Sequence, residues 1–281
     1  ARSSSTTGAK TLIAYGSTGV NAVASVTNTT IDTSSGSIDD TAGANVNVGA
    51  GQGITFTGCT FKGDAGDDLL LIAGGNVTVP IAVNSCTFVA ESASAQPYGI
   101  TVSSGFAAIT NSTFTNLDRA IQTTGSSNTT VQTSTITGGG NPTQDLTSGG
   151  AIVANGGTLI LTNNTISNNN AANYALNVNG ANVTARFNTI TGNTLNVQQQ
   201  TGTANASLNW WGSAAGPAAS SLNATTAANL VTTPVLAAAV TNPALGFVTD
   251  TFNAQTTAGV VVTTGNNTGA LGTVGAARYA A

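Results

Sequence analysis

The sequence predicts an all-β protein built as a parallel β-helix, or solenoid, of about eight turns, followed by a C-terminal β segment outside the repeat. Two observations lead to this prediction. Ala, Thr, Gly, Asn, Ser and Val dominate the 281 residues, and β-branched residues set among turn formers favour many short strands over helices. A three-residue phrase also recurs about every 26 residues, which is the signature of a repeat architecture.

The recurring phrase ends in a large apolar residue and usually has Thr in the middle. Its copies follow one another at uneven steps, so we expect connections of variable length between strands of constant register. The eight copies are Thr29-Thr30-Ile31, Cys59-Thr60-Phe61, Cys86-Thr87-Phe88, Ser112-Thr113-Phe114, Ser134-Thr135-Ile136, Asn164-Thr165-Ile166, Asn188-Thr189-Ile190 and Asn209-Trp210-Trp211.

Apolar residues stand at every second position around the phrase. The residues five and three positions before it are mostly apolar, and such alternation marks strands with one buried face. A further apolar strand precedes most copies, as at Ile100 and Val102. No single turn can bury its apolar face alone, so the turns must stack about 4.8 Å apart. The predicted core stack is Ile31, Phe61, Phe88, Phe114, Ile136, Ile166, Ile190 and Trp211.

Composition excludes several classes of function. Only 6% of the residues are charged, the net charge is −4 and His is absent. Nucleic-acid binding needs a clustered basic face, which this chain lacks. Most general acid–base catalysis loses its usual side chain without His. No apolar run approaches the roughly 18 residues of a membrane span. The start at Ala1 without Met, the acidity and the Asn content predict an exported protein after leader removal.

Three stretches carry a family resemblance. Residues 163–169 read Asn-Asn-Thr-Ile-Ser-Asn-Asn, and residues 187–193 read Phe-Asn-Thr-Ile-Thr-Gly-Asn. They resemble the right-handed parallel β-helix repeat of the pectate-lyase-like superfamily. Asn209-Trp210-Trp211-Gly212, with Gly216-Pro217 after it, resembles a phrase that closes such repeats in bacterial exported and surface proteins. The resemblance covers about residues 10–235 and implies the fold but no single activity, because enzymes, adhesins and structural proteins share it.

The resemblance also implies an internal ladder. In this superfamily the Asn that opens the phrase points inward at a turn and stacks on its equivalents, which satisfies buried amides. The implied ladder consists of Asn164, Asn188 and Asn209, continued by the smaller Ser112 and Ser134.

Cys59 and Cys86 occupy the same position on neighbouring turns. Their Cα atoms are expected about 5 Å apart, within the range of a disulfide. A disulfide and a buried pair of free thiols are both compatible with this spacing, and either is structural.

The acidic segment 63–70 is the one weak candidate for a metal site, and no other cofactor is expected. Asp64, Asp67 and Asp68 nearly match the calcium-binding pattern of Gly-rich β-rolls. That type of site needs successive copies of the turn, and no second copy occurs. A solvated turn of carboxylates is the alternative that we favour.

Residues suited to carbohydrate chemistry are few. Asp118-Arg119 is the only adjacent acid–base pair within the repeats, and polysaccharide lyases of the superfamily need acidic residues with an Arg or Lys base. Trp211 is expected in the core, which turns Trp210 outward, either covered by later chain or exposed as a platform for sugars. We expect no catalytic residues.

The chain divides into a β-helix, residues 1–235, and a capping or subunit-contact segment, residues 236–281. We predict a non-enzymatic extracellular structural protein that joins head to tail with copies of itself in a cell-surface or biofilm-matrix fibre. The alternative is a carbohydrate-active enzyme or a carbohydrate-binding adhesin. A row of Asp, Arg and Tyr across neighbouring turns would favour the alternative, whereas faces of Thr, Ser and Asn would count against it.

Overall fold

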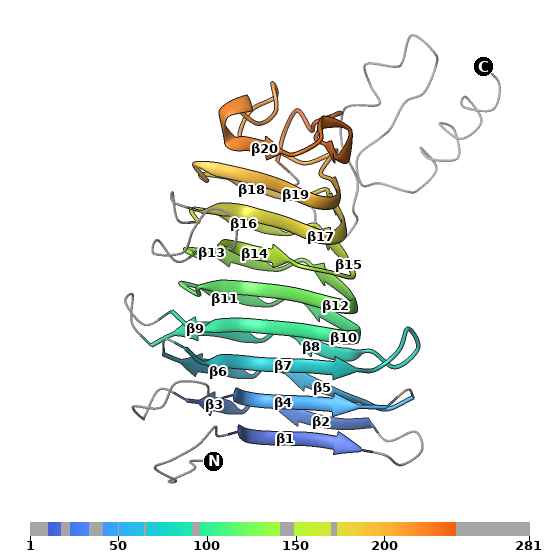
Figure 1. Cartoon of the computed structure of the whole chain (residues 1–281). Helices are drawn as coiled ribbons and strands as arrows, with labels where there is room; N and C mark the ends of the chain where they lie inside the picture. The colour runs from blue at the N-terminus through green and yellow to red at the C-terminus, as the bar shows by residue number, and fades with distance from the viewer. Residues whose placement is uncertain are drawn as a thin grey trace, which may run out of the picture.

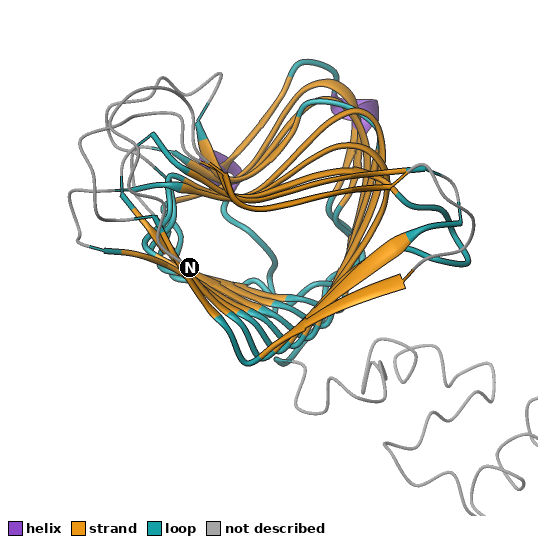
Figure 2. Ribbon diagram, turned by 90° about the horizontal axis from the view of Figure 1, so that it is seen from below, coloured by secondary structure: helices purple, strands orange, loops and turns teal. Residues whose placement is uncertain are grey.

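The computed structural model describes residues 11–17, 23–33, 42–49, 51–64, 66–91, 96–140, 149–169 and 173–239. These residues form a parallel β-helix in which each turn lies on the one before it, from the N-terminal end to the C-terminal end (Figure 1). Viewed along the axis, the strands of successive turns overlie one another around a single interior (Figure 2). The predicted all-β parallel solenoid is confirmed.

Three strand segments make one turn and define three faces of the helix. The first face contains β1 (Thr11–Ser17), β4 (Ala42–Val48), β7 (Asp68–Gly74), β14 (Gly150–Ala154), β20 (Leu222–Ala224) and the first halves of β10 (Tyr98–Thr110), β12 (Arg119–Gln132), β17 (Tyr174–Arg186) and β19 (Leu195–Asn205). The second face contains β2 (Val23–Thr27), β5 (Gly53–Thr57), β8 (Ile81–Asn84), β15 (Thr158–Thr162), β21 (Leu230–Val231) and the second halves of those four long strands. The third face contains β3 (Thr30–Asp32), β6 (Thr60–Gly63), β9 (Thr87–Ala90), β11 (Thr113–Thr115), β13 (Thr135–Thr137), β16 (Thr165–Ser167) and β18 (Thr189–Thr191).

The faces form two sheets. The long strands β10, β12, β17 and β19 run through the corner between the first and second faces, so these two faces make one 14-stranded sheet. The third face is a separate seven-stranded sheet. Among the described residues, seven turns therefore carry a strand on the third face, and an eighth closes there with an isolated bridge between Thr189 and Trp210.

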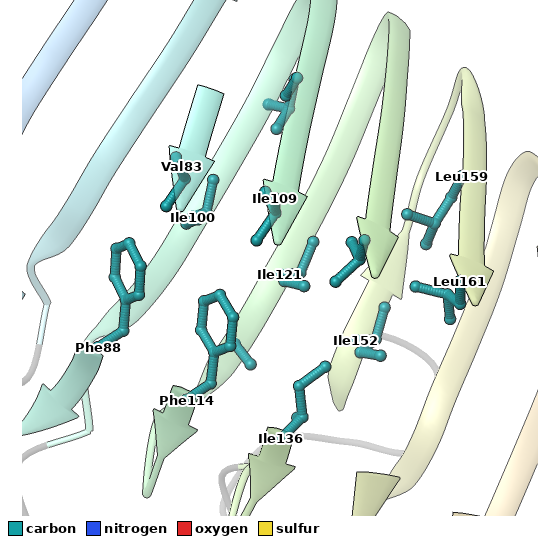
Figure 3. Close-up of a cluster of buried hydrophobic side chains, with 14 of the residues drawn as sticks. Val83, Phe88, Ile100, Ile109, Phe114, Ile121, Ile136, Ile152, Leu159 and Leu161 are labelled. Atoms are coloured by element: carbon teal, nitrogen blue, oxygen red, sulfur yellow. The ribbon is translucent and has the colours of Figure 1, made fainter. Parts of the chain in front are cut away.

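The pairing of neighbouring strands brings equivalent residues of the phrase into columns. Phe61 lies opposite Phe88, and Phe88 lies opposite Phe114. The rings in these two pairs are stacked, with centroids 4.6 and 4.8 Å apart. All eight residues of the predicted core stack are buried. Figure 3 shows how such side chains from neighbouring turns point into the same interior.

A left-handed residue makes the corner between the second and third faces. It stands one position before the phrase in every turn, where a positive φ bends the chain sharply enough to start the third-face strand. At Gly58 an added Cβ would lie 2.4 Å from Oδ1 of Asn28 on the turn below, so this position also needs glycine for space. The corner residues are Asn28, Gly58, Ser85, Asn111, Thr133, Asn163, Phe187 and Leu208.

A partial ninth turn ends the described chain. It contains two short 3-10 helices, Ala219–Ser221 and Ala227–Asn229, beside β20 and β21. Leu236 is buried, and its backbone N–H donates to the carbonyl of Asn209 at 3.0 Å. The described chain thus stays on the β-helix as far as Leu236. Nearly all of the predicted C-terminal segment lies outside the described residues. Within them, no helix has the length and hydropathy needed to cross a membrane.

Candidate functional site

Asn164, Asn188 and Asn209 form a continuous ladder inside the helix. Nδ2 of Asn164 donates to Oδ1 of Asn188 at 3.0 Å, and Nδ2 of Asn188 donates to Oδ1 of Asn209 at 3.0 Å. Each acceptor oxygen also receives the backbone N–H of the Asn below, at 2.9 and 2.8 Å. All three residues are buried. The amides of Asn164 and Asn188 are thereby held by the next turn, and Nδ2 of Asn209 donates to the carbonyl of Ala185 at 2.7 Å. These bonds satisfy polar groups that have no access to water.

Smaller side chains continue this column toward the N-terminus. The hydroxyl of Ser134 accepts the backbone N–H of Ser112 at 3.1 Å, and the hydroxyl of Ser112 accepts that of Cys86 at 3.1 Å. Ser134 receives its own support from Asn164, whose Oδ1 accepts the Ser134 N–H at 2.9 Å. The backbone-to-side-chain hydrogen bonds of the column therefore all have the same direction, because each side chain accepts from a backbone N–H of the turn below.

Cys59 and Cys86 are buried free thiols in the structure. The Sγ of Cys59 lies 3.4 Å from the carbonyl of Val26, and the Sγ of Cys86 lies 3.4 Å from the carbonyl of Asn84. Burial raises the pKa of Cys86 to about 11, so this thiol stays protonated at neutral pH. Of the two states compatible with the sequence, the structure contains the free-thiol pair.

A second ladder, which the recurring phrase alone does not predict, lies at the other end of the third-face strands. Asn169 donates its Nδ2 to Oδ1 of Asn193 at 3.0 Å, and its Oδ1 accepts the backbone N–H of Gly139 at 2.9 Å. Nδ2 of Asn193 donates to the carbonyl of Ile166 at 3.0 Å. The signal in the sequence is an Asn five residues after the Asn that opens the phrase, present in two successive copies.

The acidic turn does not gather its carboxylates around one point. Asp67 is fully buried, and its Oδ2 accepts from the hydroxyl of Thr33 at 2.6 Å and from the backbone N–H of Asp64 at 3.2 Å. Asp68 instead accepts from the hydroxyl of Thr101 at 3.1 Å. Across the described ranges, no three His, Cys, Asp or Glu side chains come together in a way that could hold a metal ion.

A row of Asp, Tyr and Arg does cross three neighbouring turns on the first face. Asp68 pairs with Tyr98, and Tyr98 pairs with Arg119. The guanidinium carbon of Arg119 lies 4.9 Å from the centre of the Tyr98 ring, and Nη1 donates to Oε1 of Gln122. Asp118, the expected acid beside Arg119, is buried. This is the kind of row that favours carbohydrate binding, and it was not predicted residue by residue.

The outward side of the third face is a regular array of hydroxyl side chains. Each strand points its middle residue inward and its two flanking residues outward. The first outward column is occupied by Thr in all seven strands, and Trp210 follows at its end, partly buried. The second column carries Asp32, Lys62 and Val89 in the first three turns and hydroxyl residues in the next four.

We call the last four turns of this array the threonine lattice. Its members face solvent to different extents, and their hydroxyls form no hydrogen bond with any other described part of the chain. It contains no charged residue. The members are Thr113, Thr115, Thr135, Thr137, Thr165, Ser167, Thr189 and Thr191.

Stacked parallel strands, amide ladders at the corners and variable connections together define a β-helix repeat protein. The model of the family described as "Right handed beta helix region" matches residues 43–217, more than half of the chain, and the chain belongs to this family. The predicted right-handed fold is thus shown, and membership of the pectate-lyase-like superfamily is consistent with it. No curated protein and no solved structure matches the chain.

Proposed function

We propose that the protein is a non-enzymatic structural subunit of a cell surface or extracellular matrix, and that it assembles head to tail with copies of itself. The observation that carries this proposal is the N-terminal edge of the large sheet. The strand order begins at β1, a seven-residue strand that is paired only with β4 among the described strands. An edge strand of this length offers a row of backbone N–H and C=O groups to another strand.

The partner for this edge is proposed to be the C-terminal segment of a neighbouring copy. Its sequence contains strand-like runs, such as Gly259-Val260-Val261-Val262, between Thr, Asn and Gly. Addition of a strand from one copy to the edge of another joins two different surfaces, and such contacts generate filaments when they do not close. The low charge supports the proposal further, since 6 basic and 10 acidic residues cause little repulsion between neighbours.

Sedimentation velocity and electron microscopy of the purified full chain test this proposal. We expect filaments or large oligomers from the full chain and monomers after deletion of residues 240–281. Val261→Asp places a charge in the proposed donor strand and should weaken assembly. Val77→Asp is the matched control, because Val77 is 75% exposed on the β-helix itself. A truncated chain that still forms the same oligomers would overturn the proposal.

Carbohydrate binding is a second candidate, favoured by the row of Asp68, Tyr98 and Arg119. An aromatic ring with a guanidinium above it and carboxylate and amide groups beside it suits an acidic sugar chain lying along the helix axis. Monomers that bind polygalacturonate, with binding lost in Arg119→Gln, would favour this function over the first. Release of unsaturated sugar products in the same assay would identify a lyase.

A further inference from the structure

The threonine lattice has a geometry that no role in head-to-tail assembly requires. Neighbouring turns repeat about every 4.8 Å, and the two outward residues of one strand are about 6.6 Å apart. The pairings of all seven third-face strands proceed without a register shift, whereas the β10–β12 and β17–β19 pairings of the other sheet contain shifts. The lattice is therefore a two-dimensional grid of hydroxyl and methyl groups with constant spacing.

The interior holds this grid in place from beneath. Thr165 and Ser167 stand between Asn164 and Asn169, and both of these amides are locked into the turn above. Thr189 and Thr191 likewise stand between Asn188 and Asn193. Inward from each strand lies one buried apolar side chain of the core stack. The outward hydroxyls are thus fixed to a framework whose polar and apolar sides are both satisfied.

We infer that the threonine lattice binds the surface of ice. A hydroxyl that exchanges one liquid water for another gains little free energy, because the two hydrogen bonds are nearly equivalent. A crystal of water differs from the liquid, since its oxygens repeat in rows at distances comparable to those of the lattice. A grid that is fixed beforehand then contacts many waters at once without a further ordering cost. The methyl groups between the hydroxyls gain from the exclusion of liquid water.

The composition of the lattice favours this occupant over two others. Sites for soluble sugars are concave and place a few polar groups around aromatic or apolar walls, whereas the lattice repeats the same small side chain across an open face. A second copy of the same face would replace water hydrogen bonds by equal ones and would bury little apolar area. Charged groups hold water in their own arrangement, and those of the described third-face strands are Asp32 and Lys62, in the first two turns. Glu91, which follows β9, forms an ion pair with Lys62 and likewise lies before the lattice.

The full-length protein is assayed by its partition into a slowly growing ice hemisphere and by inhibition of ice recrystallisation. We expect the protein to enter the ice and to restrain recrystallisation. Thr135→Tyr and Thr165→Tyr should each lower both activities by about tenfold or more, because a ring at the centre of the lattice holds the other lattice side chains away from a flat ice surface. A tenfold loss corresponds to roughly 1.4 kcal/mol. Thr184→Tyr, on the second face, should leave them unchanged. Thr165→Val keeps the shape and methyl groups and should lose less than Thr165→Tyr.

Thermal unfolding of each variant checks that the fold is retained, as we expect because all three positions point away from the core. Exclusion of the wild-type protein from ice would overturn the inference, as would equal losses in the third-face and second-face variants. Binding to crystalline cellulose or chitin that Thr135→Tyr abolishes, without any ice activity, would assign the lattice to a solid polysaccharide and would also overturn it. The inference does not depend on head-to-tail assembly, because monomers produced by deletion of residues 240–281 are expected to keep ice activity at a lower level.

Discussion

Asp67 is the residue whose surroundings differ most from what its sequence context indicates. It lies in a run of Gly and Asp that resembles a solvated turn, yet its side chain is fully buried against Thr33 of the turn below. Desolvation raises the pKa of Asp67 from 3.8 to about 6, although the hydrogen bonds from Thr33 and from the Asp64 backbone act in the opposite direction. The folded protein therefore holds this proton over a pH range in which the unfolded chain releases it.

The raised pKa predicts how stability depends on pH. Because the folded state binds more protons between about pH 4 and pH 6, the contribution of Asp67 is most favourable below pH 4 and declines as pH rises to 6. Asp67→Asn should remove this decline, as measured by urea unfolding at pH 4, 5, 6 and 7. Glu91→Gln, which removes only the exposed ion pair with Lys62, should keep the wild-type slope. An unchanged slope in Asp67→Asn would contradict the assignment.

At the scale of the element, each third-face strand of the later turns is a short extended segment fastened at both ends. The strand itself has only three residues, which cannot be stable alone. The left-handed residue at its start sets the direction, and the buried Asn beside that residue fixes the height of the turn. Since Asn164 and Asn188 each accept from the turn below and donate to the Asn of the turn above, loss of either removes hydrogen bonds to two turns.

Asn188→Ala tests the ladder at its centre. The substitution removes the acceptor of the Asn164 backbone N–H and of one amide hydrogen of Asn164, and it removes one donor to the carbonyl of Leu161, all in the interior. The other amide hydrogen of Asn164 keeps its bond to the carbonyl of Val131. We expect a loss of about 2–4 kcal/mol in the free energy of unfolding, from unsatisfied groups that cost roughly 1–3 kcal/mol each and are relieved in part by water. Asn182→Ala is the control, because Asn182 is exposed and accepts only from Thr203. Equal losses in the two variants would show that the ladder adds no stability.

At the scale of the whole molecule, the turns are nearly interchangeable units. Strand segments of one turn contact those of the turns above and below, so stability is expected to be close to a sum over turns and their interfaces. Several turns share the columns of Phe and Ile and the ladder of Asn and Ser. These columns stay in register although the connections between the strands differ in length. A turn can then be removed if the columns on either side are rejoined in register.

Deletion of residues 165–188 should remove one turn and keep the fold. It joins Asn164 to Thr189, which restores the phrase and lets β19 take the place of β17 on β14 and β15. We expect cooperative unfolding with an m value lower by roughly one part in eight, because m scales with the surface exposed on unfolding. Deletion of residues 165–187 leaves one additional residue at the corner, which disturbs the inward and outward alternation, and should give a much less stable protein. Similar stability in both deletions would contradict the register argument.

The sequence determined the repeat, the strand periodicity and the residues of the core stack, because alternation of inward and outward side chains is a local property of each strand. It also carried the internal Asn column, since the Asn opens the same phrase in three copies. Only the tertiary structure decided which side chains of neighbouring turns contact one another on the first face. Tyr98 and Arg119 come into contact because connections of different length bring their strands into register, and no local pattern sets that length.

Two further features depended on the stacking of turns. Burial of Asp67 requires Thr33 of the turn below, 34 residues earlier in the chain, so its raised pKa has no local signal. The outward Thr of the phrase is visible in the sequence of every copy except the last. A single Thr on a strand, however, indicates no more than an exposed polar residue. The pairing of seven strands without a register shift turns these residues into a lattice, because a constant distance between turns exists only in the stacked molecule.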